Sequence, residues 1–175
     1  MSNQTGQPLT AAAVRTLNNE LDAELMRLAE QITPDRLHVA PAAGEWTPAE
    51  TLAHLAEFPR FFASDLARQL EAEGAEVGRT HEHPGRNQAI ASAPGLGRDD
   101  LMTSLSSALR ELATTLEQLE DGHLGRIGNN RKYGPEPLAT FLDRYVLGHK
   151  AGHVAQLRQA LSAASPRRPA DSGPR

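Results

Sequence analysis

Residues 149–161 read HKAGHVAQLRQAL, an amphipathic helical pattern in which His149 and His153 are spaced four residues apart. At about 100° of rotation per residue, both histidines fall in the middle of the apolar stripe of a helix predicted over residues 137–163. That stripe consists of Leu138, Leu142, Val146, Leu157 and Ala160. Side chains four residues apart lie one turn apart on the same helix face. The two imidazoles should therefore point into the protein, close enough to bind one ion.

A glycine precedes each of these histidines. Gly148 and Gly152 each lower helix propensity by about 1 kcal/mol relative to alanine. We expect them to leave room for a close helix neighbour or for a bound ligand. A lone inward histidine is more often a hydrogen-bonded core residue than a metal ligand, so a metal site needs a further ligand from elsewhere in the chain.

Residues 44–55 read GEWTPAETLAHL and supply that ligand. Thr47 at the N-cap, Pro48 at the first helical position and Glu50 three residues after the cap form a capping box. A helix is therefore predicted from here to about residue 72. His54 shares one face of it with Glu50, Glu57, Phe58, Phe61 and Asp65. If this face meets the face of His149 and His153, three neutral imidazoles converge, which is the ligand set of catalytic zinc and also suits nickel or iron(II).

Two further segments complete an all-α fold. Residues 10–32 and 99–120 carry a 3.6-residue apolar rhythm, and no segment alternates convincingly with period two. Four helices with one apolar stripe each predict a four-helix bundle, and the long polar connections between its helices leave room for crossovers. The bundle domain is predicted over residues 10–164, with a flexible N-terminus over residues 1–9 and a disordered C-terminal tail over residues 165–175.

Composition excludes several classes of partner. The net charge is −4, which argues against a nucleic-acid or anionic-membrane surface. The chain has no cysteine, so it holds no disulfide, no thiolate ligand and no cysteine nucleophile. No secretory signal and no membrane-spanning stretch is recognisable, which predicts a cytoplasmic protein.

Two motifs resemble the DinB-like family, also known as DinB/YfiT-like metalloenzymes. GEWTPAETLAHL resembles the family's helix start that leads to a histidine, and GHKAGHVAQLR (residues 148–158) resembles its paired histidines followed by Gln-Leu. The resemblance covers about residues 17–161. It implies a four-helix bundle with crossover connections and a divalent metal, zinc or nickel, on His54, His149 and His153.

The resemblance also carries expectations about chemistry. Some relatives are thiol-dependent transferases or isomerases that use mycothiol or bacillithiol, and family members often form homodimers. The absence of cysteine fits a low-molecular-weight thiol supplied as a cofactor. The resulting hypothesis is a thiol-dependent S-transferase or isomerase, or a hydrolase, that acts on a small electrophile. The alternatives are a non-catalytic module that binds a metal or small ligand, and a metal-free bundle that dimerises.

Three residues are predicted to assist such a reaction. Glu57 would move a proton, Arg86 would bind a substrate carboxylate through its guanidinium fork, and Tyr145 would orient the substrate. Glu57 could instead be an outer partner of a ligand imidazole, a fourth ligand or a solvated carboxylate. Tyr145 could equally be an ordinary bundle residue.

The loop RTHEHPGR (residues 79–86) holds His81 and His83. Histidine pairs in loops are mostly solvated. The alternative is that this loop closes over the site, with Arg79 or Arg86 at the substrate.

Overall fold

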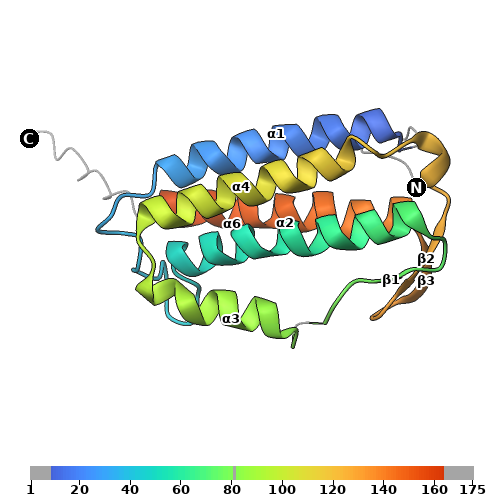
Figure 1. Ribbon diagram of the computed structural model, residues 1–175. Coiled ribbons are helices and arrows are strands. Elements are labelled where there is room, and N and C mark those ends of the chain that lie inside the picture. The colour runs from blue at the N-terminus through green and yellow to red at the C-terminus, as the bar shows by residue number, and fades with distance from the viewer. Residues whose placement is uncertain (1–8, 81, 164–175) are drawn as a thin grey trace, which may run out of the picture.

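The structure is a computed structural model that describes residues 9–80 and 82–163. Four long helical stretches lie side by side (Figure 1). They are α1 (Ala11–Glu30), α2 (Pro48–Glu71), α4 (Arg98–Leu116), and a fourth composed of α5 (Leu138–Phe141), a π-helical segment (Leu142–Gly148) and α6 (His149–Ala163). The prediction of an all-α four-helix bundle is confirmed. The predicted N-terminal and C-terminal flexible ends lie, except for Leu9, outside the described residues.

The helices are connected across the bundle rather than around it. Both α1 and α2 pack against α4 and α6, so α1 and α2 occupy one diagonal of the bundle and α4 and α6 the other. In Figure 1, α1 and α6 run from right to left, whereas α2 and α4 run from left to right. Because α2 and α4 run in the same direction, the connection between them spans the length of the bundle, and the chain crosses the bundle diagonally between α4 and the fourth helix, which confirms crossovers in the two long connections. The diagonal crossing between α1 and α2 was not predicted.

The connection between α2 and α4 carries structure of its own. It contains β1 (Glu76–Val77), α3 (Pro84–Ser92) and a single 3₁₀ turn (Ala93–Gly95). The helix α3 packs along the outside of α2 (Figure 1). The sequence analysis predicted only a polar connection here, because α3 is short and buries no residue completely, so it shows no apolar stripe.

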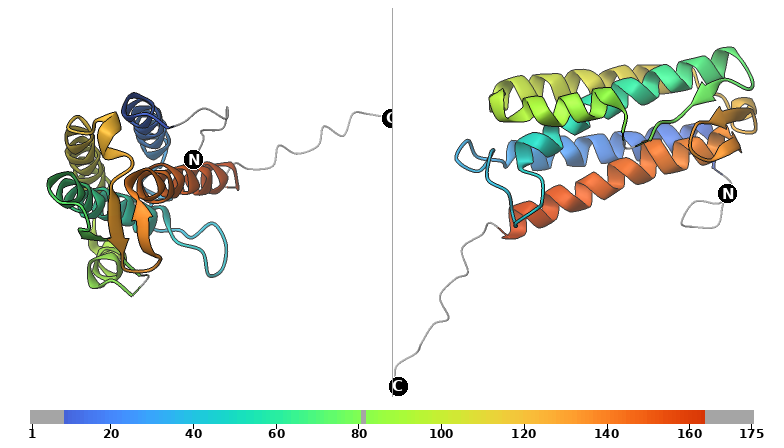
Figure 2. Two further views of the ribbon diagram at one scale, coloured as in Figure 1. Left: turned by 90° about the vertical axis from the view of Figure 1, so that its right-hand side faces the viewer. Right: turned by 90° about the horizontal axis from the view of Figure 1, so that it is seen from below.

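A small sheet closes one end of the bundle, where no strand was predicted. After a 3₁₀ turn (Asp121–His123), β2 (Ile127–Asn130) pairs antiparallel with β3 (Gly134–Pro137) and parallel with β1. Figure 2 shows these strands lying across the end of the helices. The Asn130 side-chain oxygen accepts from the backbone N–H groups of Lys132 and Tyr133, and Gly134 has φ of 77°. This turn chemistry forms the hairpin, because strands of such glycine-rich and proline-rich composition have no alternation to detect.

The predicted stripes form the core with small corrections. All six leucines of the third stripe are buried: Leu101, Leu105, Leu109, Leu112, Leu116 and Leu119. The helix itself ends at Leu116 rather than near residue 120, because the Leu119 N–H turns back to the carbonyl of Leu116 in a tighter 3₁₀-type bond. On α1, Leu17 is 37% exposed, so the inward stripe there is narrower than predicted. No described helix is long and apolar enough to cross a bilayer.

Candidate metal centre

The start of α2 fixes the direction of His54. Thr47 accepts a hydrogen bond from the Glu50 N–H at 3.1 Å, and the Glu50 carboxylate accepts from the Thr47 N–H at 2.7 Å. This capping box defines where the helix begins and hence the rotation of every later side chain. His54, seven residues after the cap, faces α6 and is 2% exposed.

A π-helical segment precedes the other two histidines. The His149 N–H bonds to the carbonyl of Arg144, five residues earlier, so the helix is locally wider than an α-helix. A Cβ on Gly148 would lie 2.9 Å from the Asp143 carbonyl oxygen of this segment, which explains the glycine. At Gly152 a Cβ would meet no neighbour within 4 Å among the described residues, so this glycine does not make room for a close helix neighbour, and room for a bound ligand stays a prediction. The absence of a Cβ at Gly148 therefore avoids a clash with the backbone of its own helix, and neither glycine makes room for a neighbouring helix.

The structure brings His54, His149 and His153 together as predicted. His149 Nε2 lies 3.0 Å from His54 Nε2 and 3.1 Å from His153 Nε2, and the three rings offer ligand atoms within 4.8 Å of one another. One imidazole nitrogen carries a single in-plane hydrogen or lone pair, so it cannot bond well to two other ring nitrogens at once. Two nitrogens on one tetrahedral zinc, each bound at about 2.0–2.1 Å, would lie about 3.3 Å apart. The donor set therefore fits a divalent metal better than it fits a hydrogen-bonded core.

Burial keeps His54 and His153 in the neutral form that binds metals. Burial, followed by repulsion from His153 and His149, lowers the pKa of His54 to about 2. Burial also lowers the pKa of His153, although its hydrogen bond with Gln156 opposes the shift. That bond joins His153 Nδ1 to Gln156 Oε1 at 2.8 Å. Because the amide oxygen can only accept, Nδ1 carries the proton and Nε2 presents a lone pair to the centre.

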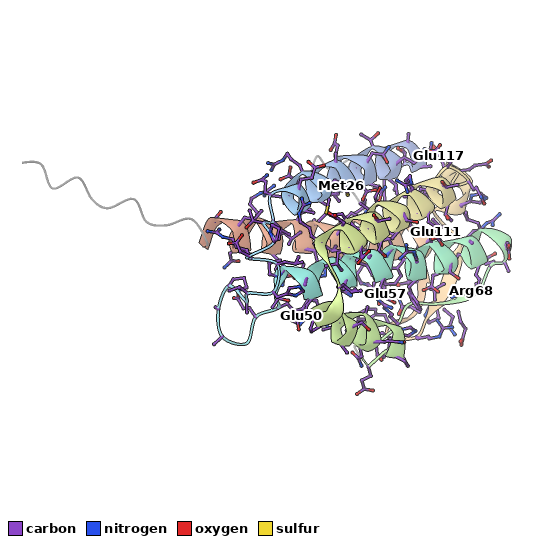
Figure 3. All side chains as sticks on the ribbon, turned by 60° about the vertical axis from the view of Figure 1, so that its left-hand side comes forward. Met26, Glu50, Glu57, Arg68, Glu111 and Glu117 are labelled. Atoms are coloured by element: carbon purple, nitrogen blue, oxygen red, sulfur yellow. The ribbon has the colours of Figure 1, made fainter. Side chains whose placement is uncertain are left out.

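Glu57 lies behind His54, on the side away from the three Nε2 atoms. Its carboxylate is 4.0 Å from His54 Nδ1, which is buried and has no hydrogen-bond partner among the described residues. Arg79 binds the same carboxylate with two parallel hydrogen bonds of 2.5 and 2.6 Å. Figure 3 labels Glu57 on α2, at the side where α3 packs. This placement favours the alternative in which Glu57 is an outer partner of a ligand imidazole over a proton-transferring role at the open coordination position.

The pairing of Arg79 with Glu57 had no signal in the sequence. The sequence predicts Arg79 only as a possible substrate-binding residue, whereas its side chain is 6% exposed and its guanidinium stacks 4.4 Å from the centre of the Phe61 ring. It also approaches His83 Nδ1 at 3.3 Å. Gly85 allows the start of α3 to come this close, because a Cβ there would lie 3.2 Å from the Glu57 carboxylate. Residue spacing could not predict the contact between Arg79 and Glu57, because Arg79 reaches α2 from a connection of irregular backbone.

Trp46 and Arg86 form one wall of the centre. The Trp46 ring stacks parallel to the His153 ring at 6.3 Å and meets the His54 ring edge-on at 5.4 Å. The Arg86 guanidinium lies 5.1 Å from the centre of the Trp46 ring. The predicted substrate-binding residue Arg86 is therefore close to the histidines. His81 lies outside the described residues.

Other polar residues singled out from the sequence lie in structural networks. Tyr145 is 9% exposed, packs against Phe62 and Phe141, and its hydroxyl accepts from Asn130 at 3.4 Å. This position is that of a core residue beside the hairpin. Asp65 is fully buried and accepts from the Gly78 N–H at 2.7 Å, so it attaches β1 to α2.

A cleft opens beside His153, and we call it the His153 cleft. Its volume is about 370 Å³, and Trp46, Thr51, His153 and Gln156 are among its lining residues. Cavities of this size hold small molecules. A ligand in the cleft would therefore contact one of the three histidines directly.

Residues 19–157 match the sequence pattern of the DinB superfamily. No curated protein matches the chain. Among solved structures, the chain is similar to YfiT from Bacillus subtilis, described as a probable metal-dependent hydrolase with an unusual four-helix bundle topology. The TM-score is 0.69 at 17% identity, covering 86% of this chain and 85% of YfiT.

Two further structures share the fold. A mycothiol-dependent maleylpyruvate isomerase matches with a TM-score of 0.65 and 17% identity over 90% of this chain, but the match spans only 62% of the isomerase. An uncharacterized protein from Clostridium difficile 630 matches with a TM-score of 0.68 and 10% identity, covering 90% of this chain and 99% of that protein. At these identities the likeness establishes the fold.

Proposed function

The chain belongs to the DinB superfamily, and from that premise we propose that it is a divalent-metal enzyme in which a low-molecular-weight thiol attacks a small electrophile. The observation that carries this proposal is the convergence of His54, His149 and His153 through their Nε2 atoms. Zinc or nickel is the proposed ion, with iron(II) as the other ion that suits this ligand set. A divalent cation on three neutral imidazoles supplies a Lewis acid that lowers the pKa of a thiol or water held beside it.

The chain's own residues have separate tasks in this scheme. His54, His149 and His153 would hold the ion, and Gln156 would keep His153 in the tautomer that presents Nε2. Glu57 would accept a hydrogen bond from the Nδ1–H of His54 and so keep that ring in its metal-binding tautomer, as in the carboxylate–histidine–metal arrangement. Glu57 would therefore affect proton transfer at the site only through its hydrogen bond to the His54 ring, and not by contact with the substrate.

The substrate side of the site is formed by Trp46, Arg86 and the His153 cleft. Arg86 is the proposed partner of a substrate carboxylate, because its planar cation lies against Trp46 near His153. Tyr145 is not part of this side of the site, because it packs in the core beside the hairpin. In the reaction itself, a sulfur electron pair would form the bond to the electrophilic carbon. The leaving group would depart with its bonding electrons, and the thiol proton would go to solvent.

Hydrolysis is the second candidate reaction, supported by the likeness to YfiT. It needs the same centre, with water in place of the thiol. A requirement for a thiol distinguishes the two reactions, because thiol transfer gives no product unless a thiol is added.

Metal content of protein purified without a histidine tag tests the proposal. We expect about one zinc or nickel ion per chain in the wild type, loss of the ion in His54→Ala and His149→Ala, and retention in His38→Ala, a matched control at an exposed histidine. The loaded protein is then given a chromogenic small electrophile with mycothiol, with bacillithiol or with no thiol. Absence of bound metal after incubation with excess zinc and nickel would overturn the proposal.

A further inference from the structure

The His153 cleft continues into a second hollow. That hollow, which we call the Val39 groove, also has a volume of about 370 Å³, and it lies between the end of α6 and the connection from α1 to α2. The two hollows share four lining residues: Pro41, Pro48, Leu157 and Ala160. The two hollows therefore adjoin along these residues, and together they form a depression with the His153 cleft at one end and the Val39 groove at the other.

The chemistry of the depression changes along its length. At the His153 cleft, Thr51, His153 and Gln156 provide polar atoms beside Trp46. In the Val39 groove, Ile32 and Leu157 are almost completely buried, and Val39 presents its side chain with 61% of the residue exposed. Leu161 adds a partly buried apolar side chain. Asp35 and Arg36 also line the Val39 groove, but most of its lining residues are apolar, and covering apolar surface with a ligand is favourable.

The geometry points to an amphipathic substrate. We infer that the electrophile carries its polar, reacting end at His153 and an apolar alkyl or aryl tail that passes Leu157 and lies in the Val39 groove. This inference rests on the proposed function, because it extends the substrate of that same site. The occupant is a small molecule rather than a protein segment, because the groove adjoins the His153 cleft and each hollow has the size of a small-molecule site.

Chain-length dependence of binding tests the inference directly. The probes are straight-chain hydroxamates from acetyl to octanoyl, added to zinc-loaded protein. Trp46 is the only tryptophan, so its fluorescence reports occupation of the His153 cleft. We expect the Kd to fall by about three- to fourfold for each added methylene, as expected for burial of apolar surface, until the Val39 groove is filled. A Kd that does not change with chain length would overturn the inference.

Two variants locate the tail. Val39→Asp should abolish the gain for octanohydroxamate and leave the Kd of acetohydroxamate unchanged. Ile127→Asp is the matched control, because Ile127 is also a β-branched exposed residue, at 40% exposure, but belongs to β2 rather than to the groove. Equal chain-length dependence in wild type and Val39→Asp would contradict the inference. If wild-type protein is dimeric and Val39→Asp is monomeric in sedimentation, the groove belongs to a second copy and the inference also fails.

Failure of the metal site would be recognised separately. If zinc does not bind, the hydroxamate head group has no partner, and the proposed function fails. The tail is then tested on metal-free protein with the carboxylates acetate to octanoate, for which the same decrease in Kd per methylene is expected. A flat series in both probes would leave no support for an apolar tail in the Val39 groove.

Discussion

Neighbouring residues of α6, His149 and Lys150, enter two buried polar clusters of opposite character. Lys150 is completely buried and donates to Asn18 at 2.5 Å and to Asp22, while Asn18 donates to Asp22 at 2.9 Å. Every polar group in that triangle has a partner of the complementary kind. In the histidine cluster, three Nε2 atoms face one another and the buried Nδ1 of His54 has no partner among the described residues.

The difference separates a structural network from a functional one. A satisfied ion pair joins α1 to α6 and needs nothing further, whereas the three Nε2 atoms converge on one point, an arrangement that a cation bound there would stabilise. The two clusters thus predict opposite responses. The histidine cluster should respond to metal and contribute little to folding, and the Lys150 cluster should contribute to folding and ignore metal.

The largest expected effect comes from breaking the histidine cluster in the presence of metal. Free zinc at about 1,000 times its Kd should raise the free energy of unfolding of wild-type protein by about 4 kcal/mol, because only the folded state holds all three ligands. His149→Ala should show no zinc-dependent rise in urea unfolding. Asp22→Asn should retain the rise in full. An equal rise in His149→Ala would place the zinc elsewhere.

Breaking the Lys150 cluster should have the next largest effect, on stability alone. Asp22→Asn leaves the buried ammonium without its counter-charge, and we expect a loss of about 3 kcal/mol in urea unfolding. The double variant Asp22→Leu/Lys150→Met removes both charges and should recover most of this loss. Zinc stoichiometry should remain about one per chain in both. Loss of zinc in Asp22→Asn would mean that the two clusters are coupled through α6.

The contrast between these clusters also explains what could be predicted from the sequence. His54, His149 and His153 were found because helical periodicity and a capping box fix the rotation of each side chain before any tertiary contact is known. Lys150 was missed because lysine is seldom buried and because its partners lie on α1, more than 100 residues away. The contact between Arg79 and Glu57 was missed for a similar reason, since no periodicity governs the irregular connection that carries Arg79.

The fold, like the site, was predictable where helical periodicity determines it and not where turns or irregular backbone do. Each of the four long helices has its own apolar stripe, and the long connections predicted the crossovers. The hairpin after Asp121 depends on the Asn130 side chain and on Gly134 rather than on alternating hydrophobicity. The π-helical segment before His149 has no sequence pattern beyond Gly148, so its effect on the position of the histidines required the structure.

An intermediate effect is expected at Glu57, which connects the histidine cluster to its surroundings. Glu57→Gln keeps the size of the side chain but weakens the proposed acceptor for His54 Nδ1 and the pairing with Arg79. We expect a 10- to 100-fold weaker zinc affinity, measured by competition with a chromophoric chelator. Glu111→Gln, an exposed carboxylate on α4 near Arg60, is the matched control and should leave zinc affinity unchanged. An affinity within twofold of wild type in Glu57→Gln would remove Glu57 from the metal centre.

The smallest expected effect distinguishes the two glycines of α6. Gly148→Ala places a Cβ 2.9 Å from the Asp143 carbonyl, and because backbone must move to relieve that contact, we expect a loss of about 1 kcal/mol in urea unfolding. Gly152→Ala meets no neighbour among the described residues and should stabilise the helix by up to about 1 kcal/mol. Zinc affinity should fall only in Gly148→Ala, because His149 follows the displaced backbone directly. If zinc affinity is unchanged in both variants, the π-helical segment does not set the position of the histidines, and the capping box of α2 would be the main determinant of how the cluster forms.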